Sequence, residues 1–171
     1  MTGRVLRVVS MAVVVLVAVT LQLTLFSHFS FDGVAPDLAL LVVLGAALVR
    51  GPDYAAVVGF GAGLVLDLAP PADHTAGRWA LSLVLVGYLT GLARPDADIS
   101  KGGTLLMAAA AAFIGTSVFA FTGMVLGDPG VTVASAFEVV PRAIGYDVLV
   151  TPIVVPLVVL LLRRIQPAPR W

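Results

Sequence analysis

The sequence contains no cysteine and very little charge. The absence of cysteine excludes disulfides, thiolate catalysis and cysteine-ligated metal sites. Charged residues make up 12% of the 171 residues, about half the share found in a typical soluble domain. Basic residues number only ten, too few and too scattered to form a nucleic-acid-binding face. Hydrophobic residues, by contrast, make up 60%, and the mean hydropathy is +1.07, which indicates a helical membrane protein.

Apolar stretches of near-membrane length recur along the whole chain, with no polar domain between them. The first stretch follows two arginines but is longer than the apolar region of a signal peptide, so we interpret it as an uncleaved span. We predict an all-α integral membrane protein with one polytopic domain, residues 1–171. Its six expected transmembrane helices are approximately 8–26, 36–49, 54–68, 79–93, 104–126 and 142–162.

The second and third stretches are short for membrane spans. Each would form a helix of only about 21–23 Å, against a hydrocarbon thickness of about 30 Å. They could be two short spans or one re-entrant hairpin. A hairpin would bury Arg50 and Asp53 near the middle of the membrane, which is costly. The sequence therefore favours two spans joined by a tight turn.

The last stretch contains three prolines. Residues 132–140 carry a modest amphipathic pattern, which predicts a separate interfacial helix. Pro141 is then expected to open the sixth span, because proline suits the first turn of a helix. Pro152 and Pro156 are expected to kink that span.

Basic residues are distributed unevenly over the turns between the stretches. If both termini lie inside, eight of the ten fall on the inner side, and only Arg78 and Arg142 fall outside. Because inner loops are enriched in lysine and arginine, we predict an N-in, C-in protein of the bacterial inner membrane. Its inner residues, some of which would contact anionic lipid headgroups, are Arg4, Arg7, Arg50, Arg94, Lys101, Arg163, Arg164 and Arg170.

Glycines at helical spacing mark two of the stretches. Gly59, Gly63 and Asp67 lie at i, i+4 and i+8, so they share one face of a helix. Gly87 and Gly91 form a second such pair. Small residues at this spacing let two membrane helices approach closely, and a lipid-facing aspartate is costly. We therefore expect these faces to point into a helix bundle.

Four charged residues form a candidate polar cluster at the outer side, namely Asp37, Asp67, Arg142 and Asp147. One interpretation is a polar pocket or partner-binding site. A second is that these carboxylates only finish helix ends, hydrated or paired with Arg78 and Arg142. A third is a proton or ion relay, although no chain of ionisable residues crosses the middle of the membrane.

No catalytic, cofactor or metal site is expected. The glycines at 59, 61 and 63 superficially resemble a nucleotide-binding loop, but Leu64 follows where that motif continues and no soluble strand precedes them, so packing is the better interpretation. His28 and His74 have no second ligand at metal-binding spacing. The turns contain no catalytic motif, and the chain is not expected to be an enzyme.

Three short motifs, in order, resemble those of the rod shape-determining protein MreD family. They are Pro36-Asp37-Leu38, Gly59-Phe60-x-x-Gly63-Leu64-x-x-Asp67-Leu68 and Gly87-Tyr88-Leu89-x-Gly91. The resemblance covers nearly the whole chain. It implies a non-enzymatic subunit of the bacterial elongation machinery that binds the single-span protein MreC, and through it MreB filaments and peptidoglycan synthases.

The resemblance also implies a fold similar to the substrate-binding S-components of energy-coupling-factor vitamin transporters. The alternative function is therefore a small-molecule, vitamin-binding subunit of a membrane transporter. It would use Asp37, Asp67, Arg142 and Asp147 as ligand contacts at the outer side.

Overall fold

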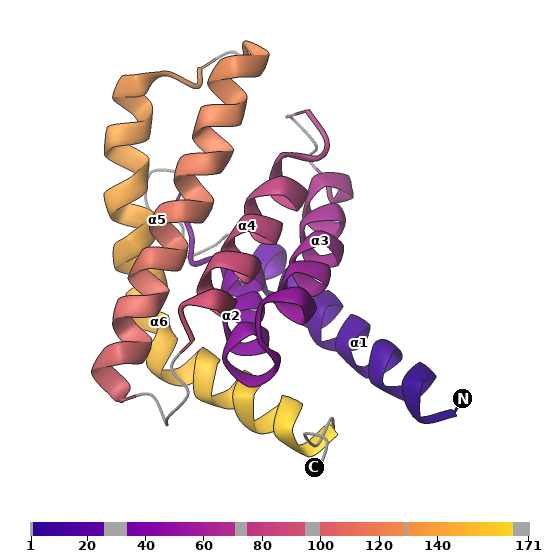
Figure 1. Ribbon diagram of the computed structural model, residues 1–171. Helices are drawn as coiled ribbons and strands as arrows, with labels where there is room; N and C mark the ends of the chain where they lie inside the picture. Colours follow the sequence, from indigo (N-terminus) through magenta and orange to yellow (C-terminus); the bar gives the residue numbers. More distant parts are fainter. Residues whose placement is uncertain (1, 26–33, 71–74, 95–99, 129, 166–171) are drawn as a thin grey trace.

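The computed structural model describes residues 2–25, 34–70, 75–94, 100–128 and 130–165, and these form a bundle of helices (Figure 1). The prediction of an all-helical fold is confirmed for this part of the chain. Its six helices are α1 Thr2–Thr24, α2 Leu38–Arg50, α3 Pro52–Leu68, α4 Arg78–Leu92, α5 Lys101–Leu126 and α6 Val133–Ile165.

Helix α2 forms the centre of the bundle. Every residue from Leu38 to Ala47 is buried, and α2 contacts each of the other five helices. A helix that is apolar on all sides can be buried on all sides, and α2 has no polar side chain before Arg50. The third stretch carries the glycines and the aspartate that were singled out from the sequence. It forms α3, which lies on a flank of the bundle and exposes Val57 and Phe60.

Helices α2 and α3 are joined by a single residue, Gly51, which has a φ of +82°. This left-handed conformation is readily available only to glycine. Pro52 then opens α3, where its fixed φ suits the first helical turn. Helix α4 returns antiparallel to α3 and lies directly against it (Figure 1).

Helices α5 and α6 form a long hairpin on the other side of α2 (Figure 1). Only these two described helices are both long enough, at 26 and 32 qualifying residues, and apolar enough to cross a membrane by length and composition. Helix α6 bends sharply between its orange and yellow parts (Figure 1), and its C-terminal half contains Pro152 and Pro156.

The predicted break at Pro141 is wrong, because α6 runs without interruption from Val133 through Pro141. The helix begins earlier because Thr132 and Ser135 cap it reciprocally. The Ser135 N–H donates to Thr132 Oγ1 at 3.1 Å, and the Thr132 N–H donates to Ser135 Oγ at 2.9 Å. Pro141 is exposed and borders an open groove between α5 and α6, so its ring has room there.

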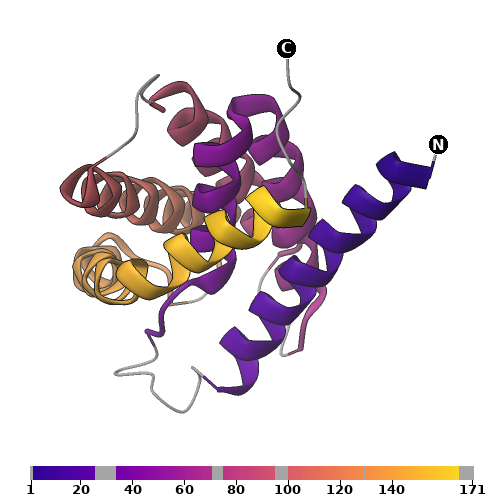
Figure 2. The ribbon, with the colours of Figure 1, turned by 90° about the horizontal axis from the view of Figure 1, so that it is seen from below.

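Helix α1 lies across the bundle and diverges from it toward the N-terminus (Figure 2). Its buried face consists of Met11, Val15, Ala18 and Val19, at the i, i+4, i+7, i+8 spacing of an amphipathic stripe. The opposite face exposes Val9, Val13 and Val17. A helix with apolar residues on both faces is suited to lipid or to a second partner helix on its outer side.

Candidate functional site

Asp67 binds the N-terminus of α4. Its Oδ2 accepts hydrogen bonds from the backbone N–H groups of Gly77 at 2.9 Å and Ala80 at 3.1 Å, and its Oδ1 accepts from Trp79 at 3.1 Å. Gly77, which precedes α4, has no side chain that could do this. The carboxylate is 2% exposed, and it lies where the helix dipole favours negative charge. Asp67 therefore supplies from α3 the cap that α4 lacks.

Arg78 is buried between α4 and α5 rather than turned toward the aspartates of the candidate cluster. Its guanidinium forms an ion pair with Asp128, donates to the Phe119 carbonyl at 2.6 Å and lies 3.9 Å from the centre of the Phe119 ring. Gly123 makes room for it, because a Cβ there would lie 2.2 Å from Arg78 Nη2. Arg78 thus ties the start of α4 to the end of α5.

Asp37 and Asp147 meet at the N-terminus of α2, although they are 110 residues apart in the chain. Asp147 Oδ1 accepts the Asp37 N–H at 2.7 Å, and Asp37 Oδ1 accepts the Leu40 N–H at 2.9 Å. Gln22 Oε1, from α1, accepts the Ala39 N–H at 3.0 Å. Side chains of α1, α2 and α6 therefore share one helix terminus, whose dipole offsets the charge of the carboxylates.

These contacts divide the four residues of the candidate polar cluster. Asp37 and Asp147 lie together at the start of α2, whereas Asp67 lies at the start of α4. Arg142 is exposed on α6. All three aspartates accept backbone hydrogen bonds, so each of them caps the N-terminus of a helix.

A cavity of about 410 Å³ adjoins the Asp37–Asp147 contact. Its polar lining residues include Gln22 and Thr116 besides the two aspartates. Trp79 and Phe119 add an aromatic wall, with ring centroids 4.4 Å apart. The volume falls within the range of about 300–1,000 Å³ that is typical of small-molecule sites.

The four glycines singled out from the sequence all lie in the contact between α3 and α4. A Cβ at Gly59 would lie 2.2 Å from the Leu83 carbonyl oxygen, and one at Gly63 would lie 2.3 Å from Ala80 Cα. From the other helix, Gly87 meets Ala55 and Gly91 meets Pro52 in the same way, at 2.5 and 2.4 Å. The two backbones therefore touch at four levels, and none of these positions has room for a side chain.

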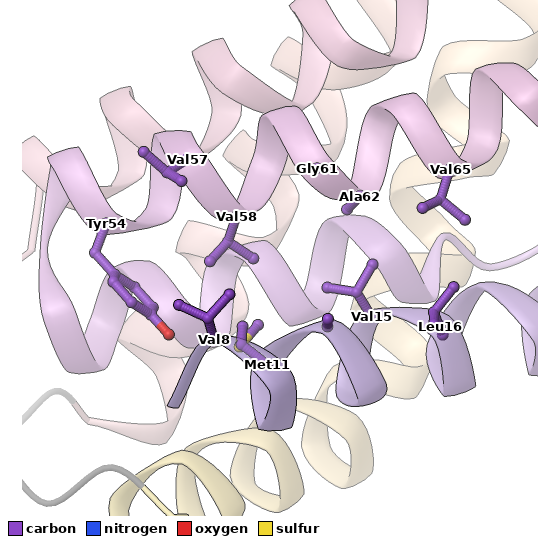
Figure 3. Close-up of a pocket in the computed structure, with 11 residues that line it drawn as sticks. Val8, Met11, Val15, Leu16, Tyr54, Val57, Val58, Gly61, Ala62 and Val65 are labelled. Atoms are coloured by element: carbon purple, nitrogen blue, oxygen red, sulfur yellow. The ribbon is translucent and has the colours of Figure 1, made fainter. Parts of the chain in front are cut away.

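Gly61 lies between two of these glycines but faces the opposite way. A Cβ there would meet nothing within 4 Å. Gly61 borders an apolar groove of about 370 Å³ between α1 and α3, in which the side chains of the two helices face each other (Figure 3). The groove is lined by Val8, Met11, Ala12, Val15, Leu16, Tyr54, Val57, Val58, Gly61, Ala62 and Val65.

Within the described ranges, no group of three or more histidine, cysteine, aspartate or glutamate residues is placed to hold a metal ion. His28 and His74, considered as ligands from the sequence, lie outside the described residues.

Comparison with known families matches residues 2–165 to the rod shape-determining protein MreD family. The match covers nearly the whole chain and agrees with the motifs around Asp37, Gly59 and Gly87. The chain belongs to the MreD family. The family predicted from the sequence is thereby confirmed, and with it a role as a rod shape-determining membrane protein. The MreD family is not a known enzyme family.

The MreD-family chain also resembles part of a transporter. It is 31% identical over 130 residues to the Na⁺/H⁺ antiporter NhaA of Albidiferax ferrireducens, covering 72% of this chain but 32% of that protein. The chain thus spans about a third of the length of this curated relative, too little to carry over its activity. No solved structure matches the chain.

Three residues of this MreD-family structure were not singled out from the sequence: Gln22, Gly123 and Asp128. Gln22 is the single amide in the apolar stretch 8–26, and a buried amide in such a stretch needs a partner. Asp128 and Gly123 both contact Arg78. Their common partner, Arg78, lies about fifty residues earlier in the chain, so no local pattern connects them.

Proposed function

We propose that this MreD-family chain is a six-span subunit of the elongation machinery in the bacterial inner membrane, with both termini inside. In this proposal it binds a single-span, MreC-like protein, and through it MreB filaments and the synthases of lateral peptidoglycan. The observation that carries the proposal is the family match across residues 2–165.

The polar contacts of the bundle support a two-sided arrangement. Asp37 lies at the start of α2, Asp67 at the end of α3 and Arg78 at the start of α4. These are the outer ends of the three helices in the proposed topology. At the opposite end, Arg94 Nη1 lies 3.5 Å from the Leu48 carbonyl oxygen, next to Arg50. Basic residues at that end fit the inner surface.

The partner helix is proposed to dock on the outside of the bundle, in the groove between α1 and α3 (Figure 3). The faces of Gly59 and Gly63 are covered by the backbone of α4. These two glycines therefore contribute to packing within the bundle and cannot contact a partner. Gly61 is open on the groove side. A glycine notch of this kind lets a second helix approach closely.

Co-purification tests this assignment with two substitutions on one helix. Gly61→Leu places its Cβ where nothing lies within 4 Å and extends its side chain into the groove, so we expect the variant to fold but to recover at least tenfold less MreC-like partner from solubilised membranes. Gly63→Leu collides with the backbone of Ala80, so it reduces the yield of the folded chain itself. The matched control is Phe60→Leu, an exposed apolar residue of α3 that does not line the groove.

The outcome of Gly61→Leu decides where the partner binds. Partner recovery at the wild-type level would rule out this groove as the docking site. If the wild-type chain itself recovers no partner under conditions in which it remains folded, the proposed complex is wrong.

A second function, a small-molecule-binding subunit with an S-component-like fold, is favoured by one observation. The cavity of about 410 Å³ brings Asp37 and Asp147 together with aromatic side chains. Asp67 and Arg142 do not line it, so the contacts proposed for this function reduce to two of the original four. A thermal-shift screen against vitamins tests it, and a ligand whose stabilisation is lost in Thr116→Val would support it.

A further inference from the structure

Helices on the two flanks of the bundle differ greatly in length. Helices α3 and α4 have 17 and 15 residues, whereas α5 has 26. At 1.5 Å per residue, these correspond to about 25, 22 and 39 Å. The α5–α6 hairpin accordingly extends beyond the α3–α4 pair at the top of Figure 1.

The exposed apolar side chains also cover a shorter length on α3 and α4 than on α5. On α3 they form a stripe from Val57 through Phe60 and Leu64 to Leu68, which spans about 17 Å along the helix axis. On α4 a similar stripe runs from Leu81 to Leu92. On α5 the exposed apolar side chains occur from Leu106 through Phe113 and Phe121 to Leu126, and they span about 30 Å along the helix axis, the full thickness of a typical hydrocarbon core.

Both ends of the short flank are polar and held in place. At the outer end, the carboxylate of Asp67 binds the first N–H groups of α4. At the inner end, Asp53 is exposed in the first turn of α3, and Arg94 is exposed just beyond α4. Neither end can move deeper into hydrocarbon without bringing these groups or uncapped backbone with it.

We infer that the α3–α4 flank is a lipid-binding surface that holds the bilayer locally thin, while the α5 flank contacts bilayer of full thickness. This rests on the membrane location in the proposed function. The occupant is lipid because a regular apolar stripe covers both short helices, and because Arg94, which is exposed at the inner end, is complementary to anionic headgroups. A bilayer adapts to a short apolar surface by thinning around it.

Spin labels can measure this thickness directly, because the chain has no cysteine and each single-cysteine variant carries one label. Asp53→Cys and Ala69→Cys lie beyond the two ends of the α3 stripe, about 24 Å apart along the helix axis. Leu106→Cys and Val125→Cys replace exposed apolar residues near the two ends of α5, about 28 Å apart along the helix axis. The full chain is reconstituted in vesicles of 18-carbon phosphatidylcholine and phosphatidylglycerol, without any partner protein.

The expected result is opposite for the two pairs. Both α3 labels are accessible to a water-soluble nickel chelate, although they are closer together. Both α5 labels are accessible to oxygen and protected from the chelate. If either α3 label is protected from the chelate, as the α5 labels are expected to be, the bilayer is not thinned and the inference is wrong. If all four labels are accessible to the chelate, the chain does not cross the bilayer, and the proposed membrane location fails as well.

Discussion

At the scale of single residues, the start of α4 depends on a carboxylate from another helix. Asp67→Asn replaces one acceptor oxygen by an NH₂ group that faces backbone N–H donors, so at least one of three hydrogen bonds is lost. We expect a loss of about 2 kcal/mol in the free energy of unfolding, because a buried donor is left unpaired. Thermal unfolding in mild detergent measures it.

The matched control for this change is Asp53→Asn, which alters an exposed aspartate in the first turn of the same helix. It should change stability by less than about 0.5 kcal/mol. Equal melting temperatures for Asp67→Asn and the wild-type chain would show that the cap does not stabilise α4.

The ion pair between Arg78 and Asp128 offers a second test at this scale. Arg78 is 3% exposed, so Asp128→Asn leaves a buried charge without its counter-ion and should cost about 3 kcal/mol. Adding Arg78→Met to that variant removes the charge and should recover part of the loss. Unfolding of the two single variants and the double variant completes the cycle; strictly additive losses would contradict a direct interaction.

Several of these contacts could not be predicted from local sequence. Spacing places Gly59 and Gly63 on one face, but it does not say which helix lies against them. The Asp37–Asp147 contact joins residues 110 positions apart, and its third member, Gln22, comes from yet another helix. Such contacts depend on the packing of whole helices, and no periodicity within one stretch encodes them.

At the scale of elements, the contact between α3 and α4 is one of backbones. Gly59→Ala adds a Cβ that would lie 2.2 Å from the Leu83 carbonyl oxygen. Since that oxygen belongs to the backbone and cannot move alone, we expect a loss of about 1–3 kcal/mol. Gly61→Ala, two residues later, meets nothing and should gain up to about 1 kcal/mol from helix propensity. Melting temperatures should therefore shift in opposite directions, and a shift in the same direction would refute this packing.

Helix ends were harder to predict than helices. Proline at 141 was expected to open a helix, yet α6 already begins at Val133. Thr132 and Ser135 exchange hydrogen bonds at the start of α6. This pair of capping residues could be recognised in the sequence, and it sets the start of the helix ahead of the proline. The burial of α2 on all sides likewise explains why so short a helix can stand at the centre, since it needs no lipid contact along its length.

At the scale of the whole molecule, the orientation proposed for the chain can be tested on α5. A straight helix of 26 residues is about 39 Å long, which exceeds the hydrocarbon thickness, so its two ends must reach opposite surfaces if it crosses. Gly102→Cys lies at its start, at an exposed position where a Cβ meets nothing. Ala134→Cys lies at the exposed start of α6, beyond its end.

With both termini inside, a membrane-impermeant maleimide added to intact spheroplasts should label Ala134→Cys. It should label Gly102→Cys only after the membrane is permeabilised. Labelling of Gly102→Cys alone would mean that the chain is inverted, with eight of its ten basic residues on the outer surface, against the usual distribution. Labelling of both positions in intact spheroplasts would mean that α5 does not cross the membrane, and the six-span arrangement would then be wrong at its longest straight helix.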